Sequence, residues 1–244
     1  MFSLQDLQTY SYVGIGWVAW IEMETAPKLY RLRGGSTSWT LGVRWLPMSL
    51  AIAVAAAYIA GSIDFAVVVG RMYGIDIHKE GSGNPGASNV LRTIGKVPAA
   101  MVFVGDMLKG TVGAAMGMIA SGATDPMVHW ALLAGLAAVV GHCYPIFHRF
   151  KGGKGVATAG GVMLFVVPLV AIGSTLLWAV IVKLTKTASI GSLVLAVITL
   201  PLAMWRGVEG LSLVWLGILI LLVVWRHRGN IGRMIRGSEK KVPA

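Results

Sequence analysis

The chain has 244 residues, of which 56% are hydrophobic and only 13% charged, and its mean hydropathy is +0.73. A soluble domain of this length needs far less apolar sequence for its core, so the composition predicts an integral membrane protein. The single cysteine, Cys143, excludes an intramolecular disulfide framework, and the histidines show no zinc-ligand spacing, so we expect neither a metal nor a cofactor. The formal net charge of +11 gathers between apolar runs, which indicates cytoplasmic loops and anionic partners rather than nucleic acid.

Residues 1–47 differ in composition from the rest of the chain. They carry scattered charges, and their apolar stretch from Val13 to Ile21 is too short to cross a bilayer. The segment also lacks the basic start and the small-residue cleavage site of a secretory signal. We therefore interpret residues 1–47 as an N-terminal extension of unknown role and residues 48–244 as a membrane domain, with Met48 as an alternative start.

Apolar and basic segments alternate from residue 48 onward. The apolar stretches cover roughly residues 48–70, 97–121, 127–147, 156–183, 188–205 and 209–225. The basic segments are residues 71–96, 148–158 and 226–244. The positive-inside rule predicts that all three basic segments lie on the cytoplasmic side.

This charge pattern requires an odd number of membrane crossings, because six single crossings would place the last basic segment outside. One solution is that Pro168 and Gly173 break the stretch 156–183 into two short helices. The other is that 188–225 forms a half-depth hairpin. Both predict an all-α fold, a polytopic membrane helix bundle of about seven transmembrane helices with some short or broken.

Charged residues within the apolar stretches need compensation, because an ionised group in hydrocarbon costs roughly 2.5 to 3.5 kcal/mol on insertion scales. Asp106 and Lys109 are three residues apart, so one helical face can hold them as an ion pair, which we interpret as structural. Asp64 has no such neighbour. We expect it to face the interior of the bundle or the headgroups.

The first basic segment contains a glycine-rich loop, residues 81–92, with the sequence GSGNPGASNVLR. Glycines let backbone N–H groups approach an oxyanion, and Arg92 can bind it with two hydrogen bonds. The neutral donors in this loop are Ser82, Asn84, Ser88 and Asn89. The alternative is an ordinary turn, with a helix N-cap at Ser88 or Asn89. In that case the positive charge of Arg92 only sets the orientation of the chain in the membrane.

The second segment places Gly152-Gly153-Lys154-Gly155 directly before an apolar helical run. The unpaired N–H groups at the start of a helix favour an anion. The segment is not a Walker A loop, since Gly155 stands where that loop has Ser or Thr. The alternative is a flexible turn with interfacial lysines.

The third segment, residues 226–233, has the sequence RHRGNIGR. His227 and Asn230 are three residues apart, so both can point the same way from a helix end. A basic tail that binds anionic lipid is the alternative explanation. Because all three segments are expected on one membrane face, together they predict a site with room for two phosphate groups.

These three segments resemble the signature motifs of the bacterial membrane-embedded, acyl-phosphate-dependent glycerol-3-phosphate acyltransferases, the PlsY family. The resemblance runs from about Met48 to Glu239, with the motifs in the same order and spacing. Ser88 stands where the family usually has Thr and keeps the hydroxyl group. Asp64 stands where Pro is usual, which leaves the end of the first helix open. Residues 1–47 have no counterpart.

The resemblance implies transfer of a fatty acyl group from acyl phosphate to the sn-1 hydroxyl of glycerol 3-phosphate, giving lysophosphatidic acid and phosphate. It also implies a monomer with seven membrane helices in the bacterial plasma (inner) membrane, surrounded by membrane lipids, with the active site facing the cytoplasm. The residues expected to act in catalysis are Ser82, Arg92, Lys154, His227 and Asn230. Those expected to bind substrate are Gly83, Asn84, Ser88, Asn89, Gly152, Gly153, Gly155 and Thr158.

An acyl phosphate has a good leaving group, so positioning and charge neutralisation are the main tasks, and the sequence shows no Gly-x-Ser-x-Gly elbow. The groups expected to hold glycerol 3-phosphate are Arg92, Lys154 and Ser82. Those expected to donate to the acyl phosphate are Gly152, Gly153 and Asn89. His227 is either a general base or a structural group. A membrane transporter of a small phosphorylated anion and a lipid-binding structural protein remain as alternatives.

Overall fold

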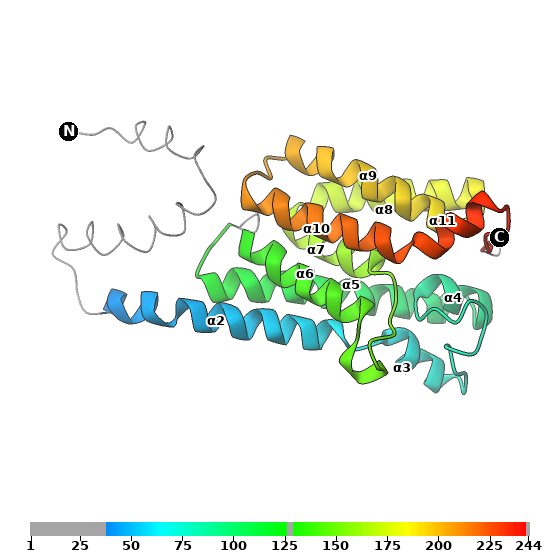
Figure 1. The fold of residues 1–244 in the computed structure, drawn as a ribbon, viewed down its shortest axis with the longest axis horizontal. Helices are drawn as coiled ribbons and strands as arrows, with labels where there is room; N and C mark the ends of the chain where they lie inside the picture. The colour runs from blue at the N-terminus through cyan, green and yellow to red at the C-terminus, as the bar shows by residue number, and fades with distance from the viewer. Residues whose placement is uncertain (1–37, 126–128, 243–244) are drawn as a thin grey trace. The chain divides into compact units, whose positions relative to one another are not determined.

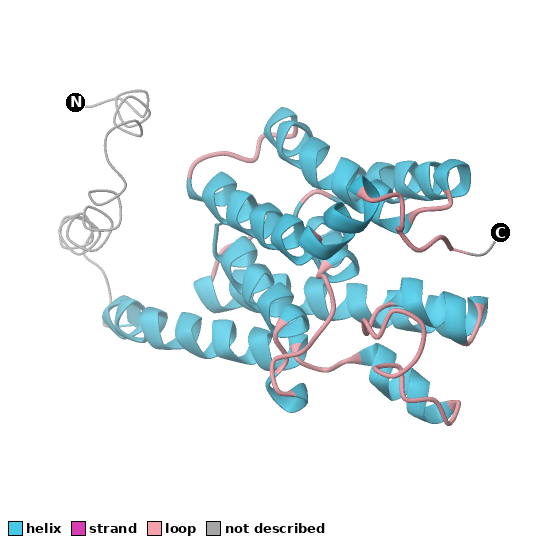
Figure 2. Cartoon of the chain, turned by 45° about the vertical axis from the view of Figure 1, so that its right-hand side comes forward, coloured by secondary structure: helices cyan, strands magenta, loops and turns pink. Residues whose placement is uncertain are grey.

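The computed structural model describes residues 38–125 and 129–242, and every regular element in them is a helix (Figure 2). The helices are α2 (Ser38–Gly61), α3 (Phe65–Met72), α4 (Ala87–Thr93), α5 (Lys96–Ser121), α6 (His129–Cys143), α7 (Val156–Val166), α8 (Pro168–Thr185), α9 (Ala188–Trp205), α10 (Leu211–Arg226) and α11 (Arg228–Ile235), with a 3-10 turn η1 (Ile146–His148). Residues 48–244 form a compact unit by themselves. The extension expected over residues 1–47 falls mostly outside the described residues, so its role stays a prediction.

The all-α membrane architecture is confirmed by the length and composition of the helices. Five described segments are long and apolar enough to cross a bilayer, and the bent pair α10 and α11 makes up to six. These segments are Leu46–Met72, Lys96–Ser121, His129–His148, Pro168–Thr185 and Ala188–Trp205. Helix α7 is apolar but shorter. The expected number of seven crossings stays a prediction.

The stretch 156–183 is broken where the sequence predicted, at Pro168. Helix α7 ends at Val166, and Val167 leaves the helical region (φ −139°, ψ 76°), because the ring of a following proline disfavours the α conformation. Gly173, the other candidate for a break, lies inside α8. Helix α9 is long enough to span the bilayer, which argues against the half-depth hairpin.

The structure shows where the first helix ends, which the sequence left open. Helix α2 ends at Gly61 and α3 begins at Phe65, because Asp64 caps the second helix. The buried Asp64 carboxylate accepts hydrogen bonds from the backbone N–H groups of Ala66 and Val67, at 3.1 and 3.2 Å. The start of α3 therefore supplies the hydrogen-bond partners of Asp64, which the sequence did not reveal.

Helix α5 packs closely against α6 and α7 through glycines. A Cβ atom at Gly110 would lie 2.0 Å from the carbonyl oxygen of Thr158, and one at Gly161 would lie 1.9 Å from that of Met107. Such small-residue contacts are typical of helices in membranes, where close van der Waals packing drives association. Helices α4 and α11 lie at the same end of the bundle (Figure 1), so the first and third polar segments of the sequence gather there.

Candidate active site

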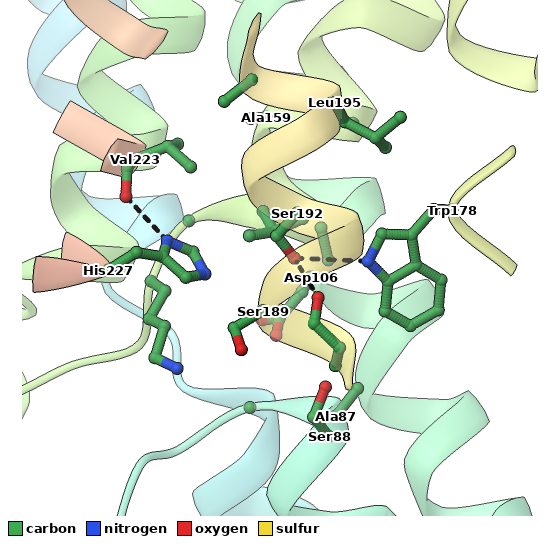
Figure 3. Close-up of a pocket in the computed structure, with 18 of the residues that line it drawn as sticks. Ala87, Ser88, Asp106, Ala159, Trp178, Ser189, Ser192, Leu195, Val223 and His227 are labelled. Carbon is green, nitrogen blue, oxygen red and sulfur yellow. Dashed lines mark hydrogen bonds between the residues drawn. The ribbon is translucent and has the colours of Figure 1, made fainter. Parts of the chain in front are cut away.

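The three polar segments line one cavity in the described part of the chain. All the residues expected to act in catalysis contribute to its wall, namely Ser82, Arg92, Lys154, His227 and Asn230. Of the residues expected to bind substrate, those that also line it are Asn84, Ser88, Asn89 and Gly155. The cavity continues between α7, α8, α9 and α10 along apolar side chains, with Ala159 and Leu195 toward one end and Ser88 toward the other (Figure 3).

Asn89 folds the first segment. Its side-chain oxygen accepts a hydrogen bond from the N–H of Ser82 (2.7 Å), and its amide nitrogen donates to the carbonyls of Ile77 (3.3 Å) and Glu80 (3.0 Å). Both amide hydrogens are used within the loop, so Asn89 positions this segment, and its expected contact with a phosphate stays a prediction. The N-cap alternative at Ser88 or Asn89 is wrong, because both lie inside α4, which follows Gly86.

Arg92 extends from α4 to the C-terminal residues. Its Nε donates to the carbonyl of Lys241 (2.8 Å) and one Nη to that of Lys240 (3.1 Å). Burial lowers the pKa of Arg92, but a guanidinium stays charged at any physiological pH. Since a guanidinium has five N–H groups, Arg92 keeps donors for an anion in the cavity.

The second segment connects α6 to α7 and is held from two sides. The N–H of Gly153 donates to the carbonyl of His142 (3.0 Å), while Arg226 donates to the carbonyls of Gly152 (2.7 Å) and Gly153 (3.0 Å). Gly155 adopts φ +83°, a conformation that favours glycine, and α7 begins at the next residue. The loop thus ends at a helix N-terminus beside the cavity.

Lys154 lies at this helix start with its ammonium group among other cations. Burial lowers its pKa to about 8; the negative charge of Glu239 opposes the shift, whereas Arg233, Arg92 and Arg226 add to it. No described residue accepts a hydrogen bond from the Lys154 side chain. This concentration of positive charge in a partly desolvated cavity favours an anionic ligand.

The third segment begins where α10 meets α11. The His227 ring is only 2% exposed, and its Nδ1 lies 2.8 Å from the carbonyl oxygen of Val223 (Figure 3). Because a carbonyl can only accept, Nδ1 carries the proton, and Nε2 of the neutral ring is left as an acceptor. Asn230 is buried, and its amide nitrogen donates to Glu239.

Glu239 joins α9 and α11 beside the cavity, a role that we did not predict from the sequence. Its carboxylate accepts hydrogen bonds from Asn230, from Ser189 of α9 (2.8 Å) and from Arg233 of α11 (2.8 Å). Burial alone would raise the pKa of Glu239, but these hydrogen bonds hold it below the usual value. The carboxylate is therefore ionised and fixes the third segment in place.

Four of the expected substrate-binding residues do not line the cavity: Gly83, Gly152, Gly153 and Thr158. Gly83 forms a turn with φ +68°. The carbonyls of Gly152 and Gly153 are turned to Arg226, so these glycines shape the loop. Thr158 is fully buried where α7 meets Gly110 of α5.

Comparison with known proteins connects this geometry with one family. The model of the family described as Glycerol-3-phosphate acyltransferase matches residues 51–237. The chain belongs to this glycerol-3-phosphate acyltransferase family.

The chain matches its relatives over almost their whole length. The glycerol-3-phosphate acyltransferase of Bacillus velezensis is 40% identical over 196 residues, which is 80% of this chain and 98% of the relative. That of Bacillus cytotoxicus is 42% identical over 186 residues, covering 76% and 91%.

Solved structures also resemble the acyltransferase. Crystal structures of PlsY, an integral membrane glycerol 3-phosphate acyltransferase, match in two forms. The glycerol 3-phosphate form has a TM-score of 0.74 and 37% identity, and covers 80% of this chain and 96% of that one. The lysophosphatidic acid form has a TM-score of 0.73 and 38% identity, with 79% and 95% covered.

A buried polar cluster supports the second segment of the acyltransferase. Lys109 forms the expected ion pair with Asp106 (2.8 Å) and also donates to the carbonyl of Ile63 (2.8 Å). The Nδ1 atom of His142 lies 3.4 Å from the same Asp106 carboxylate, and both His142 and Asp106 line the cavity. The ion pair therefore does more than neutralise charge, since it orients a histidine whose carbonyl accepts a hydrogen bond from Gly153 in the second segment.

Sequence reasoning missed three residues that hold the acyltransferase site together: Arg226, His142 and Glu239. Arg226 was counted among the basic residues that set topology, and nothing local shows that it reaches a loop 73 residues away. Glu239 offered a signal, because it is the single acidic residue in the basic segment 226–244. An isolated carboxylate among cations is a reasonable candidate for a hydrogen-bonding centre.

Proposed function

We propose that this acyltransferase transfers a fatty acyl group from acyl phosphate to the sn-1 hydroxyl of glycerol 3-phosphate, releasing lysophosphatidic acid and inorganic phosphate. The observation that carries the proposal is one cavity with two chemically different parts. Its polar part contains Arg92 and Lys154, and its apolar part runs between α7 and α10. This combination suits a phosphorylated polar acceptor together with a fatty acyl donor.

The polar groups support direct attack of the acceptor hydroxyl on the donor. Acyl phosphate is a mixed anhydride whose leaving group is phosphate, so a covalent enzyme intermediate is not required. Arg92 and Lys154 neutralise negative charge on the phosphates and at the reacting carbonyl. The hydroxyl of Ser82 accepts from the N–H of Asn84 (3.4 Å), which leaves its O–H free to donate to a phosphate oxygen.

His227 has the geometry of a hydrogen-bond acceptor for the substrate hydroxyl. Val223 fixes the tautomer, so Nε2 presents a lone pair on a residue that lines the cavity. In this role the ring orients the sn-1 oxygen for attack, while the departing phosphate takes the proton, because burial lowers the pKa of His227 to about 4 and makes the ring a weak base. We expect His227→Gln to keep the KM for glycerol 3-phosphate within about three-fold and to lower kcat by about 100-fold. If kcat falls and KM rises by similar factors, a purely structural role of His227 would be favoured.

We place the protein in the bacterial inner membrane as a monomer, with the polar end of the cavity facing the cytoplasm. The basic segments 71–96, 148–158 and 226–244 support this orientation through the positive-inside rule. Glycerol 3-phosphate is water-soluble and would enter from the cytoplasm, whereas the acyl chain of the donor would enter from the lipid between helices.

The donor is tested by incubating purified protein in detergent with labelled glycerol 3-phosphate and either palmitoyl phosphate or palmitoyl-CoA. We expect lysophosphatidic acid with palmitoyl phosphate alone. Product with palmitoyl-CoA alone would contradict the proposed donor. Absence of product with both donors, together with uptake of glycerol 3-phosphate by proteoliposomes, would favour transport.

A further inference from the structure

Arg226 is the last residue of α10, and its guanidinium binds two successive carbonyls in the loop between α6 and α7. Nε donates to Gly153 at 3.0 Å and one Nη to Gly152 at 2.7 Å. The guanidinium carbon also lies 4.9 Å from the ring centroid of Tyr144, within the range of a cation–π contact. Arg226 does not line the cavity, so it acts on the loop from behind.

The direction of these carbonyls determines where the N–H groups of the loop point. In a planar trans peptide, the C=O and N–H bonds point in opposite directions. The peptide between Gly152 and Gly153 follows this pattern, with its carbonyl on Arg226 and its N–H on the carbonyl of His142. The next peptide directs its carbonyl to Arg226, so the N–H of Lys154 points away from Arg226. No described residue accepts a hydrogen bond from this N–H.

The two glycines need such an external restraint because they have no side chains to limit rotation. If the peptide between Gly153 and Lys154 rotated, a carbonyl oxygen would replace the N–H on the opposite side, and its negative dipole would repel an anion. A side chain cannot supply the restraint, because a Cβ atom at Gly153 would lie 2.1 Å from Nε2 of His142.

We propose that Arg226 is a positioning residue for phosphate binding: by holding the carbonyls of Gly152 and Gly153, it keeps the N–H of Lys154 directed to a substrate phosphate. The inference rests on the proposed function only in that the anion at this loop is a substrate. Arg226 itself does not contact the substrate. Its effect is therefore expected on phosphate affinity more than on the rate of the bound complex.

Arg228 provides a matched control, because it is two residues away, carries the same charge and is exposed. Its guanidinium lies 4.5 Å from the ring of Trp225 and donates to the carbonyl of the same residue (3.1 Å), so it has no contact with the loop. Lysine variants of Arg226 and Arg228 both keep the positive charge, so its effects on topology and general electrostatic attraction are retained in the two. Only the proposed restraint distinguishes them.

The experiment compares Arg226→Lys and Arg226→Ala with Arg228→Lys and Arg228→Ala. An ammonium group cannot bind both carbonyls in the same planar arrangement, so we expect Arg226→Lys to raise the KM of at least one phosphate substrate by about ten-fold or more. We expect kcat to stay within about three-fold and the Arg228 variants to stay within about two-fold in both parameters. Added guanidinium should partly restore the KM of Arg226→Ala and leave Arg228→Ala unchanged.

Direct binding separates this inference from the proposed reaction. The affinity for glycerol 3-phosphate, and separately for inorganic phosphate, is measured by calorimetry on the same detergent-purified proteins and requires no turnover. Weaker phosphate binding by Arg226→Lys than by Arg228→Lys supports the inference even if the donor proves to be different. Unchanged affinities and KM values in Arg226→Lys, or equal losses in the two lysine variants, would overturn it.

Discussion

Lys154 is a site cation whose charge depends on pH within an accessible range. Burial and the nearby Arg233, Arg92 and Arg226 bring its pKa to about 8, although Glu239 opposes the shift. A lysine with a lowered pKa is charged below that value and neutral above it, whereas the arginines remain charged throughout. A bound phosphate would stabilise the ammonium form and raise the pKa again. The pH dependence should therefore be clearest in the enzyme before substrate binds.

We expect kcat/KM of the wild-type enzyme to fall as the pH rises through about 8, the value to which Lys154 is shifted, because the free enzyme then loses this charge. A phosphate monoester has its second pKa near 6 and does not titrate in this window. Lys154→Arg should show no fall there, even if its absolute activity is lower. Initial rates measured in detergent from about pH 6.5 to 9.5 test this. A fall at the same pH in Lys154→Arg would assign the titration to another group.

Removing the lysine side chain gives a second test at this position. Lys154→Ala should lower kcat/KM by about ten- to 100-fold or more, because a charge-assisted contact to phosphate is lost in a desolvated site. Lys151→Ala is the matched control, since Lys151 is exposed in the same loop. Near-normal turnover by Lys154→Ala, measured with labelled glycerol 3-phosphate, would contradict the site assignment.

At the scale of elements, the contact between α5 and α7 fixes the position of the second segment. Gly161 of α7 lies so close to α5 that a Cβ atom would be 1.9 Å from the carbonyl of Met107. Gly160 is adjacent in sequence, but a Cβ atom there would meet no heavy atom within 4 Å. The two neighbouring glycines therefore differ in function: one allows the helices to approach, and the other faces the cavity.

Gly161→Ala should destabilise the protein by about 1 to 3 kcal/mol, because the new methyl group forces the two backbones apart. Gly160→Ala should be neutral or slightly stabilising, since alanine is the better helix former. Thermal unfolding of both variants in the same detergent measures the difference. Equal unfolding temperatures would show that α5 and α7 do not pack through Gly161.

The helix boundary at Pro168 was predictable from the sequence, whereas the boundary at the Asp64 cap was not. Pro168 disfavours the helical conformation of the residue before it, so the break between α7 and α8 followed from the sequence. The break before α3 did not, because Asp64 in an apolar run looked like a charge in need of a partner. Its partners are the first backbone N–H groups of the helix that it starts.

At the scale of the whole molecule, the C-terminal residues link parts of the site that are distant in sequence. Glu239 binds Ser189, Asn230 and Arg233, and the side chain of Lys240 donates to the carbonyl of Gly81 (2.8 Å). These contacts join the first and third segments to the start of α9. The last described residues are thus part of the site.

Glu239→Gln should lower the thermal stability and raise the KM for glycerol 3-phosphate, because its three donors lose a charged acceptor. Hydrogen bonds to charged groups contribute about 1.5 to 3 kcal/mol each, so we expect a loss of at least about 2 kcal/mol. Glu209→Gln is the control, since Glu209 is an exposed acid. An unfolding temperature of Glu239→Gln equal to that of the control would contradict the linking role.

Orientation in the membrane is tested with single-cysteine variants in a Cys143→Ala background. Lys241→Cys lies beside the site, and Glu209→Cys lies in the connection before α10. If α10 crosses the membrane once with its C-terminal end inside, a membrane-impermeant maleimide should label Glu209→Cys in intact cells. It should label Lys241→Cys only after lysis. The reverse pattern would place the site outside.

The sequence by itself determined that this protein resides in a membrane and that its site favours anions. Long apolar runs require a bilayer, and glycine-rich basic segments favour anions wherever they are placed, because both properties depend on composition and local spacing. The residues that line the polar part of the cavity were therefore largely predictable.

The tertiary structure alone decided which groups face the cavity and which hold the others in place. Arg226 and Glu239 bind partners far away in the chain, and Asn89 uses both amide hydrogens within its own loop. Such roles arise from hydrogen bonds to backbone carbonyls and to distant side chains. Almost any sequence offers these partners, so only the folded arrangement shows which of them a given side chain reaches.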